Sequence, residues 1–339
     1  MICALCKLRE ANKKNTHYLT DGIIRSCLNQ DGSKEREKGL YFDLSNDSPF
    51  VKFSFQRNTS VEQIEDTLGR ESSDQEQEEA KRIPFSVDNV FCSICEDIFT
   101  TIESGFSDIL PLFRAANLSQ TDSVILADGT LARLFFLIQV WRTSVCREEV
   151  KLSEETAESL RLLILNHAEA SPEAIRQFPL VITYLETLGE EAEYTTNLVG
   201  LTNSRSPNLL FMNDFVIQFY ERVESVIWFD FYGLNEEGAY HEFVNTVGDE
   251  LIVHVFHNDK RKQFIHDLLH AEKVRPSVDA YINLFVQGWK HVFGELPSAQ
   301  IQQEFVNEVL SGERALGLKY TKEQLLHSIM DFVNGRAGF

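Results

Sequence analysis

The sequence lacks the long apolar stretches that mark membrane-spanning helices and secretory signals. No run approaches the roughly 18 consecutive apolar residues that a membrane span requires, and the opening residues MICALCKLRE contain no apolar signal core. The chain also has no glycine-rich phosphate loop and no Gly-x-Ser-x-Gly elbow, which disfavours ATPases and serine hydrolases. We therefore expect a cytoplasmic protein with no membrane partner.

Basic residues are scarce. The 32 Lys and Arg residues are outnumbered by 52 Asp and Glu residues, and the net charge is −20. Such a charge repels nucleic-acid phosphates at long range unless the basic residues are clustered. One basic cluster lies near the N-terminus, at Lys7, Arg9, Lys13 and Lys14. The acidic excess is ordinary for a soluble protein, and it also suits one that docks on a basic partner.

Cysteine is rare, but its spacing is informative. Four of the six cysteines form two Cys-x-x-Cys pairs, Cys3 with Cys6 and Cys92 with Cys95. Each pair presents two sulfurs from one tight turn, which matches the tetrahedral geometry that Zn²⁺ prefers. The spacing predicts one structural zinc ion. Disulfides and redox-active thiols are the alternatives; a reducing compartment disfavours the first, and a thioredoxin-like motif needs only one pair.

Hydrophobic periodicity predicts mostly helices after the second cysteine pair. Cys92 and Cys95 lead into a helical pattern, which is typical of a treble-clef finger. The remaining two cysteines, Cys27 and Cys146, lie on apolar stripes and are predicted to be buried. Further helices are expected near residues 129–148, 153–167, 172–187, 259–272, 276–293, 298–311 and 321–335.

Alternating apolar residues predict strands in three regions. Residues 39–55 read as a β-hairpin around a turn at 46–49, and residues 208–234 with 250–257 read as about three antiparallel strands. The aromatic run 228–232 belongs to this predicted sheet. Residues 60–82 are rich in Glu, Gln, Ser and Asp, and we interpret them as an exposed insertion.

The N-terminal pattern resembles a broad group of bacterial HNH-endonuclease-like proteins. The resemblance covers about residues 1–150 and comprises the first cysteine pair, Thr16-His17, the segment TDGIIRSCLN, and the later CSICEDIFTTIE. It implies that His17 is the general base and that Glu96 holds Mg²⁺ or Mn²⁺. Thr16 stands where many members have a metal-binding Asp, and Thr20 where they have Pro.

Each of these residues also has a structural interpretation. His17 could hydrogen-bond a cysteine sulfur or a backbone carbonyl beside the finger. Glu96 and Asp97 lie in the first turn of the predicted helix, where acidic side chains interact favourably with the helix dipole. Glu103 reads as a solvated acid.

A second group of histidines is a weaker metal candidate. His266 and His270 are one helical turn apart, and His254 and His257 precede them, but the Glu of a His-Glu-x-x-His motif is missing. Ordinary surface or core histidines are the favoured interpretation.

The sequence as a whole predicts an α+β protein. We expect an HNH-like finger domain over residues 1–118, followed by a helix-rich domain with a small antiparallel sheet over 119–339. The resemblance implies a metal-dependent endonuclease that acts on nucleic acid, in bacterial anti-phage defence. The alternative is a non-catalytic zinc-finger subunit that docks in a multi-protein complex, with a protein partner encoded nearby.

Overall fold

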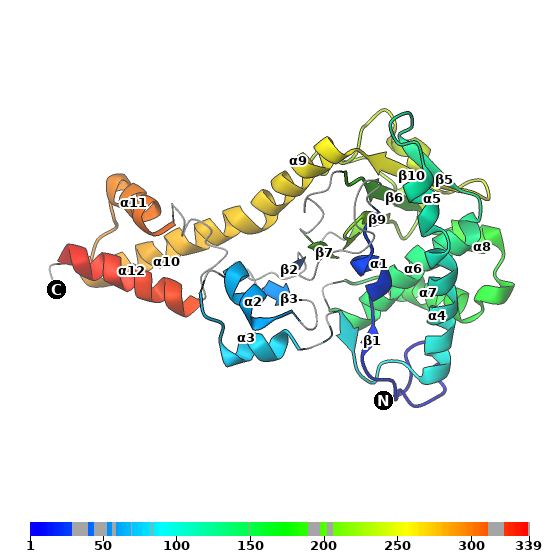
Figure 1. The fold of residues 1–339 in the computed structure, drawn as a ribbon, viewed down its shortest axis with the longest axis horizontal. Coiled ribbons are helices and arrows are strands. Elements are labelled where there is room, and N and C mark those ends of the chain that lie inside the picture. The colour runs from blue at the N-terminus through cyan, green and yellow to red at the C-terminus, as the bar shows by residue number, and fades with distance from the viewer. Residues whose placement is uncertain are drawn as a thin grey trace.

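The computed structural model describes residues 1–28, 40–43, 53–55, 59–68, 70–81, 83, 85–148, 150–188, 197–201, 206–310 and 322–337. Figure 1 shows a body built from a sheet and several helices, with a long helical arm that extends from it. Within the described ranges no helix is long and apolar enough to cross a membrane.

The N-terminal region combines a two-stranded ribbon with two helices. β1 (Thr16–His17) pairs antiparallel with β4 (Ser86–Val87). This pairing brings together the two ends of the long segment that separates the cysteine pairs in the chain. α1 (Asp21–Arg25) follows β1. α4 (Ser93–Ser107) begins directly after Cys92, its N-cap residue. The prediction that the second cysteine pair opens a helix is therefore confirmed.

The sheet of the body is large and mixed. It has eight strands in the order β3-β2-β7-β8-β9-β6-β10-β5. β10 pairs parallel with β6, and β2 pairs parallel with β7, whereas the other neighbours are antiparallel. The prediction of a small antiparallel sheet is therefore wrong. The strands are β2 (Leu40–Asp43), β3 (Phe53–Phe55), β5 (Ser123–Leu126), β6 (Leu180–Leu185), β7 (Asn197–Leu201), β8 (Asn208–Met212), β9 (Phe215–Phe219) and β10 (Leu251–Phe256).

One face of the sheet packs against a layer of helices. The most buried helix is α6 (Gly129–Cys146), which contacts α4, α7 (Glu154–Leu165), α8 (Pro172–Arg176) and β10. α5 (Leu110–Ala115) lies between α4 and β5 in the chain. A single apolar cluster extends from Cys3 to Val255, across the predicted domain boundary at residue 118.

The opposite face of the sheet is covered by irregular chain and by α9 (Asn258–Leu269). Side chains of alternate positions, such as Leu209, Phe211 and Val216, pack there against Phe231 and Phe264. The aromatic run 228–232 therefore packs on the sheet without being part of it. Phe231, Tyr232 and Gly233 have φ angles of 47°, 56° and 77°, a left-handed turn that a strand does not accommodate.

A helical arm follows α9. A π-helical turn, His270–Val274, joins α9 to α10 (Arg275–Phe293), and α11 (Ala299–Phe305) and α12 (Lys322–Ala337) complete the arm. A second π-helical turn, Val306–Leu310, follows α11. The arm has an apolar core of its own, which includes Phe285, Phe305 and Phe332.

The acidic segment after residue 59 forms two short helices, α2 (Val61–Leu68) and α3 (Asp74–Glu79). Ser73 and Glu76 form a reciprocal capping box at the start of α3, which explains how so polar a sequence becomes helical. Most of the described positions are exposed, and Ile64 is a buried exception. The strands of the predicted hairpin are confirmed by β2 and β3, whereas its turn at 46–49 lies outside the described residues.

The predicted helix at 172–187 is wrong beyond its first turns. α8 ends at Arg176, and residues 180–185 form β6, which is buried at every position. The prediction of about three strands over residues 208–234 and 250–257 is confirmed by β8, β9 and β10. Their antiparallel arrangement is confirmed for β8 and β9, whereas β10 pairs parallel with β6. The predicted helices at 129–148 and 153–167 are confirmed as α6 and α7, and Ser153 caps α7 through its side chain.

Candidate functional site

Four buried cysteines meet near the N-terminus. Cys3 and Cys6 come from the first turn of the chain, while Cys92 and Cys95 come from the start of α4; their sulfur atoms all lie within 4.8 Å of one another. In a tetrahedral zinc site with Zn–S bonds of about 2.3 Å, the sulfurs are about 3.8 Å apart. The donor set and its spacing therefore fit one metal ion such as zinc. Among the described residues, no other group of three or more His, Cys, Asp or Glu side chains lies close enough together to bind a metal ion.

Backbone hydrogen bonds build the first cysteine turn. The amide of Lys7 donates to the Cys3 carbonyl at 2.9 Å, and the amide of Cys3 donates to the Arg9 carbonyl at 2.8 Å. Lys7 has a φ of 53°, a left-handed conformation that lets the chain reverse direction within the turn. Both sulfurs of the pair consequently face the same side.

Further hydrogen bonds join the first turn to the segment before α4. The amide of Ala4 donates to the Val90 carbonyl at 3.0 Å, and the amide of Lys13 donates to the Phe91 carbonyl at 3.1 Å. The amide of Cys92 donates to the Cys3 sulfur at 3.3 Å, a contact that stabilises a thiolate. Backbone hydrogen bonds therefore hold the segments that carry the two cysteine pairs against each other.

The four thiols differ in acidity. Burial raises the pKa of Cys3 and of Cys95. Burial also acts on Cys6, but hydrogen bonds involving the backbone of Leu8 and Arg9 outweigh it and lower its pKa to about 6. All six cysteines are free thiols, which agrees with the argument against disulfides. Cys27 is buried as expected, whereas Cys146 is only partly buried.

His17 lies on β1, and its side chain is partly buried. Its Nε2 atom is buried and has no hydrogen-bond partner among the described residues. The expected hydrogen bond to a cysteine sulfur or a backbone carbonyl is not seen in this part of the chain. Burial lowers the pKa of His17, so that the imidazole is neutral at pH 7 and one of its ring nitrogens can accept a proton.

Glu96 lies in the first turn of α4 and is partly buried. Its Oε2 atom and the hydroxyl of Thr16 are buried, and neither makes a well-aligned hydrogen bond in the region that the structure describes. Burial raises the pKa of Glu96, and the nearby Thr16 hydroxyl acts on it in the opposite direction. Buried polar atoms without partners are rare in folded proteins, and they often mark the place of a water, an ion or a ligand.

An ion pair links His17 and Glu96 electrostatically. Arg142 of α6 and Glu103 of α4 both affect the pKa of His17 and that of Glu96, so the two side chains lie around the same pair of charges. No direct hydrogen bond joins His17 to Glu96 among the described residues. The exposed Asp97 is not part of this cluster.

The Arg142–Glu103 pair belongs to a buried network that the sequence did not reveal. Arg142 is 1% exposed and contacts Glu103, and the Thr20 hydroxyl donates to Glu103 at 2.7 Å. The side-chain amide of Gln139 donates to the same hydroxyl at 2.8 Å, and the Arg142 guanidinium lies 4.9 Å from the centre of the Phe99 ring. Glu103 is therefore an ion-pair partner rather than the solvated acid we expected. The available signal in the sequence was the position of Gln139 and Arg142, one turn apart within the mostly apolar stretch of this helix.

The second histidine group does not form a metal site in the described residues. The rings of His266 and His270 are stacked with their centres 6.1 Å apart, and neither belongs to a cluster of metal-binding side chains. His254 and His257 line a separate cavity.

Comparisons with known proteins produced no match: no family model, no curated protein and no solved structure resembles the chain significantly. The HNH-like interpretation therefore rests on the residues discussed above.

Proposed function

We propose that the protein is a metal-dependent nuclease whose N-terminal region is an HNH-like, treble-clef finger stabilised by one zinc ion. The proposal is supported by one arrangement above all: a buried, unpartnered nitrogen of His17 on β1 and a buried carboxylate oxygen of Glu96 in the first turn of α4, directly after Cys95, lie around the same Arg142–Glu103 pair. The first cysteine pair lies in a turn closed by an antiparallel bridge between Ile2 and Glu10, and the second pair opens α4. A cysteine turn and a helix that share one cluster are elements such a finger requires.

In this proposal His17 is the general base. Its depressed pKa keeps the imidazole unprotonated at neutral pH, so Nε2 or Nδ1 can take a proton from the attacking water. Glu96 would provide an oxygen ligand for Mg²⁺ or Mn²⁺, which supplies positive charge where the leaving oxygen develops negative charge. Arg142, fixed by Glu103, holds a positive charge close to both residues.

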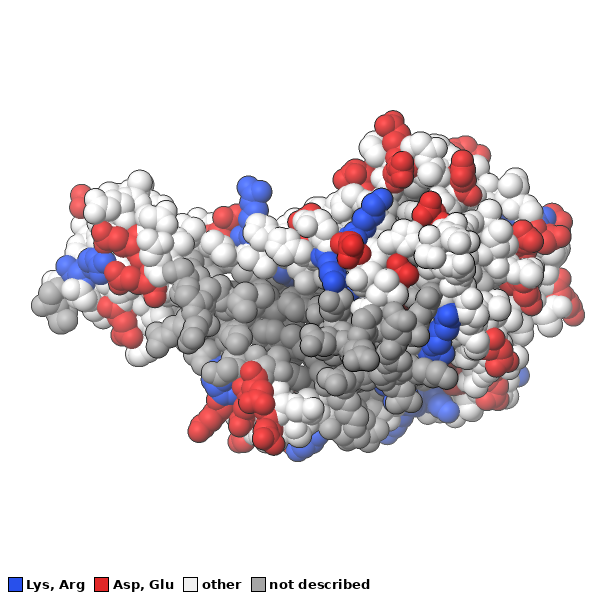
Figure 2. Space-filling model, turned by 45° about the horizontal axis from the view of Figure 1, so that its top comes forward, with Lys and Arg blue, Asp and Glu red and all other residues white. Residues whose placement is uncertain are grey.

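The surface charge limits where a nucleic acid could approach. Figure 2 shows acidic side chains spread over the body and the arm. Lys13 and Lys14 are exposed close to His17 in the chain, and they are the residues that we expect to contact phosphates. Lys7 is less suitable, because its amino group pairs with Glu158 at 2.6 Å.

The test is cleavage of supercoiled plasmid DNA and of labelled RNA by purified protein with Mg²⁺ or Mn²⁺. We expect His17→Ala to abolish cleavage while zinc content and circular dichroism stay as in the wild type. His291→Ala, at an exposed position of α10, is the matched control and should cleave normally. Cleavage that persists at full rate in His17→Ala would refute the proposal.

A second function is favoured by the helical arm. The arm has its own apolar core and extends from the body (Figure 1), as expected of a docking element in a multi-protein complex. A non-catalytic finger subunit should show no cleavage with any divalent metal, and it should co-purify with a partner encoded nearby. Detection of His17-dependent cleavage would exclude this alternative.

A further inference from the structure

A cavity of about 370 Å³ lies against the edge of the sheet and shares no residue with the cysteine cluster. Its walls come from β5, β10, the segment 233–243 and the first turn of α9. This volume is within the range of sites that bind small molecules, about 300–1,000 Å³.

The cavity has a mixed lining with an apolar part. Ile252 and His254 of β10 face it, because the alternate positions of this strand point into the main core. Ile125 of the neighbouring strand β5 pairs with Ile252 and is 54% exposed. Such exposed apolar surface on a concave wall favours an apolar ligand body.

His254 adds a neutral polar group to the lining. Its ring stacks on Phe243 with the centres 4.4 Å apart, and burial lowers its pKa to about 4. The imidazole is therefore uncharged at pH 7. Its ring nitrogens have no hydrogen bond within the described residues, so they can donate to or accept from a ligand.

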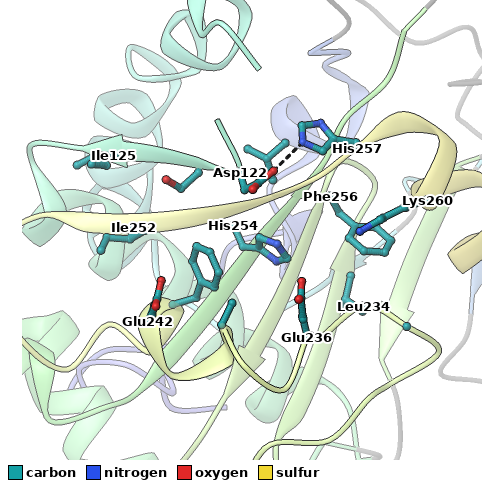
Figure 3. Close-up of a pocket in the computed structure, with 15 residues that line it drawn as sticks. Asp122, Ile125, Leu234, Glu236, Glu242, Ile252, His254, Phe256, His257 and Lys260 are labelled. Carbon is teal, nitrogen blue, oxygen red and sulfur yellow. Dashed lines mark hydrogen bonds and ion pairs between the residues drawn. The ribbon is translucent and has the colours of Figure 1, made fainter. Parts of the chain in front are cut away.

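Charged side chains of both signs surround the opening. Glu236, Glu242 and Lys260 are exposed, and in the described part of the chain their side chains make no ion pair or hydrogen bond. Figure 3 shows Glu236 directed toward His254, with Lys260 on one side and Ile125 and Ile252 on the other. These charges are therefore available to a ligand.

His257, at the end of the same cavity, is already engaged. Its two ring nitrogens lie 3.0 Å from Asp122 and 3.0 Å from Glu186. This residue shapes the wall and does not supply a free charge. The available groups are therefore Lys260, the two glutamates and the neutral His254.

We propose that this cavity binds a small zwitterion with an apolar body, of the chemical class of an α-amino acid with an aromatic or aliphatic side chain. The ligand ammonium meets Glu236, its carboxylate meets Lys260, and its side chain lies on Ile125 and Ile252. A simple anion would face two glutamates, and a simple cation would face Lys260. Only a ligand that carries both charges satisfies both signs, and this site is independent of the proposed nuclease site.

Isothermal titration with three probes tests the assignment: L-phenylalanine, phenethylamine, which lacks the carboxylate, and 3-phenylpropionate, which lacks the ammonium. We expect L-phenylalanine to bind at least about tenfold more tightly than either analogue, because each loses one charge-assisted hydrogen bond. Equal binding of L-phenylalanine and one analogue, or no binding of any probe, would overturn the proposal.

Two variants identify the side chains that bind the carboxylate and the ammonium of the ligand. Lys260→Met should remove the advantage of L-phenylalanine over phenethylamine, and Glu236→Gln should remove its advantage over 3-phenylpropionate. The controls are Lys290→Met on α10 and Glu237→Gln beside Glu236, both at exposed positions outside the cavity. If both cavity variants keep the wild-type preference for L-phenylalanine while circular dichroism shows an intact fold, Lys260 and Glu236 do not bind the charged groups of the ligand.

Discussion

The buried Arg142–Glu103 pair should be essential for stability, and Glu103→Ala tests this. The change leaves the Arg142 guanidinium, which is 1% exposed, without its carboxylate partner. Removing one member of a buried ion pair typically costs about 3–5 kcal/mol of unfolding free energy. The Glu103 side chain is 21% exposed, and water can partly replace it, so we expect a loss near the lower end, about 3 kcal/mol.

Urea unfolding at neutral pH, followed by circular dichroism, measures the loss as a lower midpoint with an unchanged slope. The double variant Glu103→Ala/Arg142→Met removes both charges, and it should be less destabilised than the two single losses added together. Glu155→Ala is the matched control, because it breaks an exposed ion pair with Arg222 at 3.4 Å, and such pairs contribute little. The reasoning fails if Glu103→Ala is no more destabilising than Glu155→Ala, or if the two single effects simply add.

Three further changes have defined outcomes. Cys92→Ser should lower the zinc content from one ion per chain toward none by elemental analysis and destabilise the N-terminal region, since metal binding and folding are coupled; a full zinc content would contradict the cluster. Burial alone lowers the pKa of His257, but Asp122 and Glu186 outweigh it and raise it. Its stabilising contribution is therefore present below the ordinary histidine pKa, about 6.5, and is lost as the pH rises through the higher folded value. Unfolding midpoints between pH 6 and 8 should fall more for the wild type than for His257→Gln, and parallel profiles would contradict this. Phe106→Ala should cost about 3–5 kcal/mol, because the ring stacks on Phe135 with the centres 3.9 Å apart; a chemical-denaturation midpoint near that of the wild type would show that the core has repacked.

Local patterns predicted the elements that depend on local chemistry. The helix after Cys95 and the cap at Ser153 follow from residues within a few positions of each other, and both are confirmed. No local pattern connects Cys3 and Cys6 with Cys92 and Cys95, which lie far apart in the sequence. Their clustering was predicted instead from the tetrahedral geometry that zinc prefers, and it is confirmed.

The predictions that were wrong concern segments whose structure depends on contacts with residues far away in the sequence. β6 is a mostly apolar segment after Pro179, interrupted only by Thr183 and buried at every position, and periodicity alone does not distinguish such a strand from a buried helix. Its parallel pairing with β10 needs a neighbour about 70 residues away, as the Val253–Ile182 register shows. The aromatic run at 228–232 has strand-like composition, but the left-handed turn at Phe231 and Tyr232 prevents a strand.

The candidate site was only partly predictable for the same reason. His17 and Glu96 could be selected by resemblance to a motif, but the burial and the charges that shift their pKa values come from several elements, including Arg142 of α6 and Glu103 of α4. Arg142 and Gln139 lie on a helix more than 30 residues beyond Glu103 in the chain, as the separation of 39 between Arg142 and Glu103 shows. The role of Arg142 and Gln139 could be recognised only in the folded structure.

The distance along the chain between the cysteine pairs affects the order of events during synthesis. Cys92 follows Cys3 by 89 residues, and ribosomes add roughly 5–20 residues per second. The first two thiols therefore emerge roughly 4–18 s before their partners, and during that interval they offer a metal ion only half of its coordination shell. A metal ion that needs all four thiolates could be bound only after the start of α4 has been made, so the first cysteine turn is translated before α4 but would be completed after it.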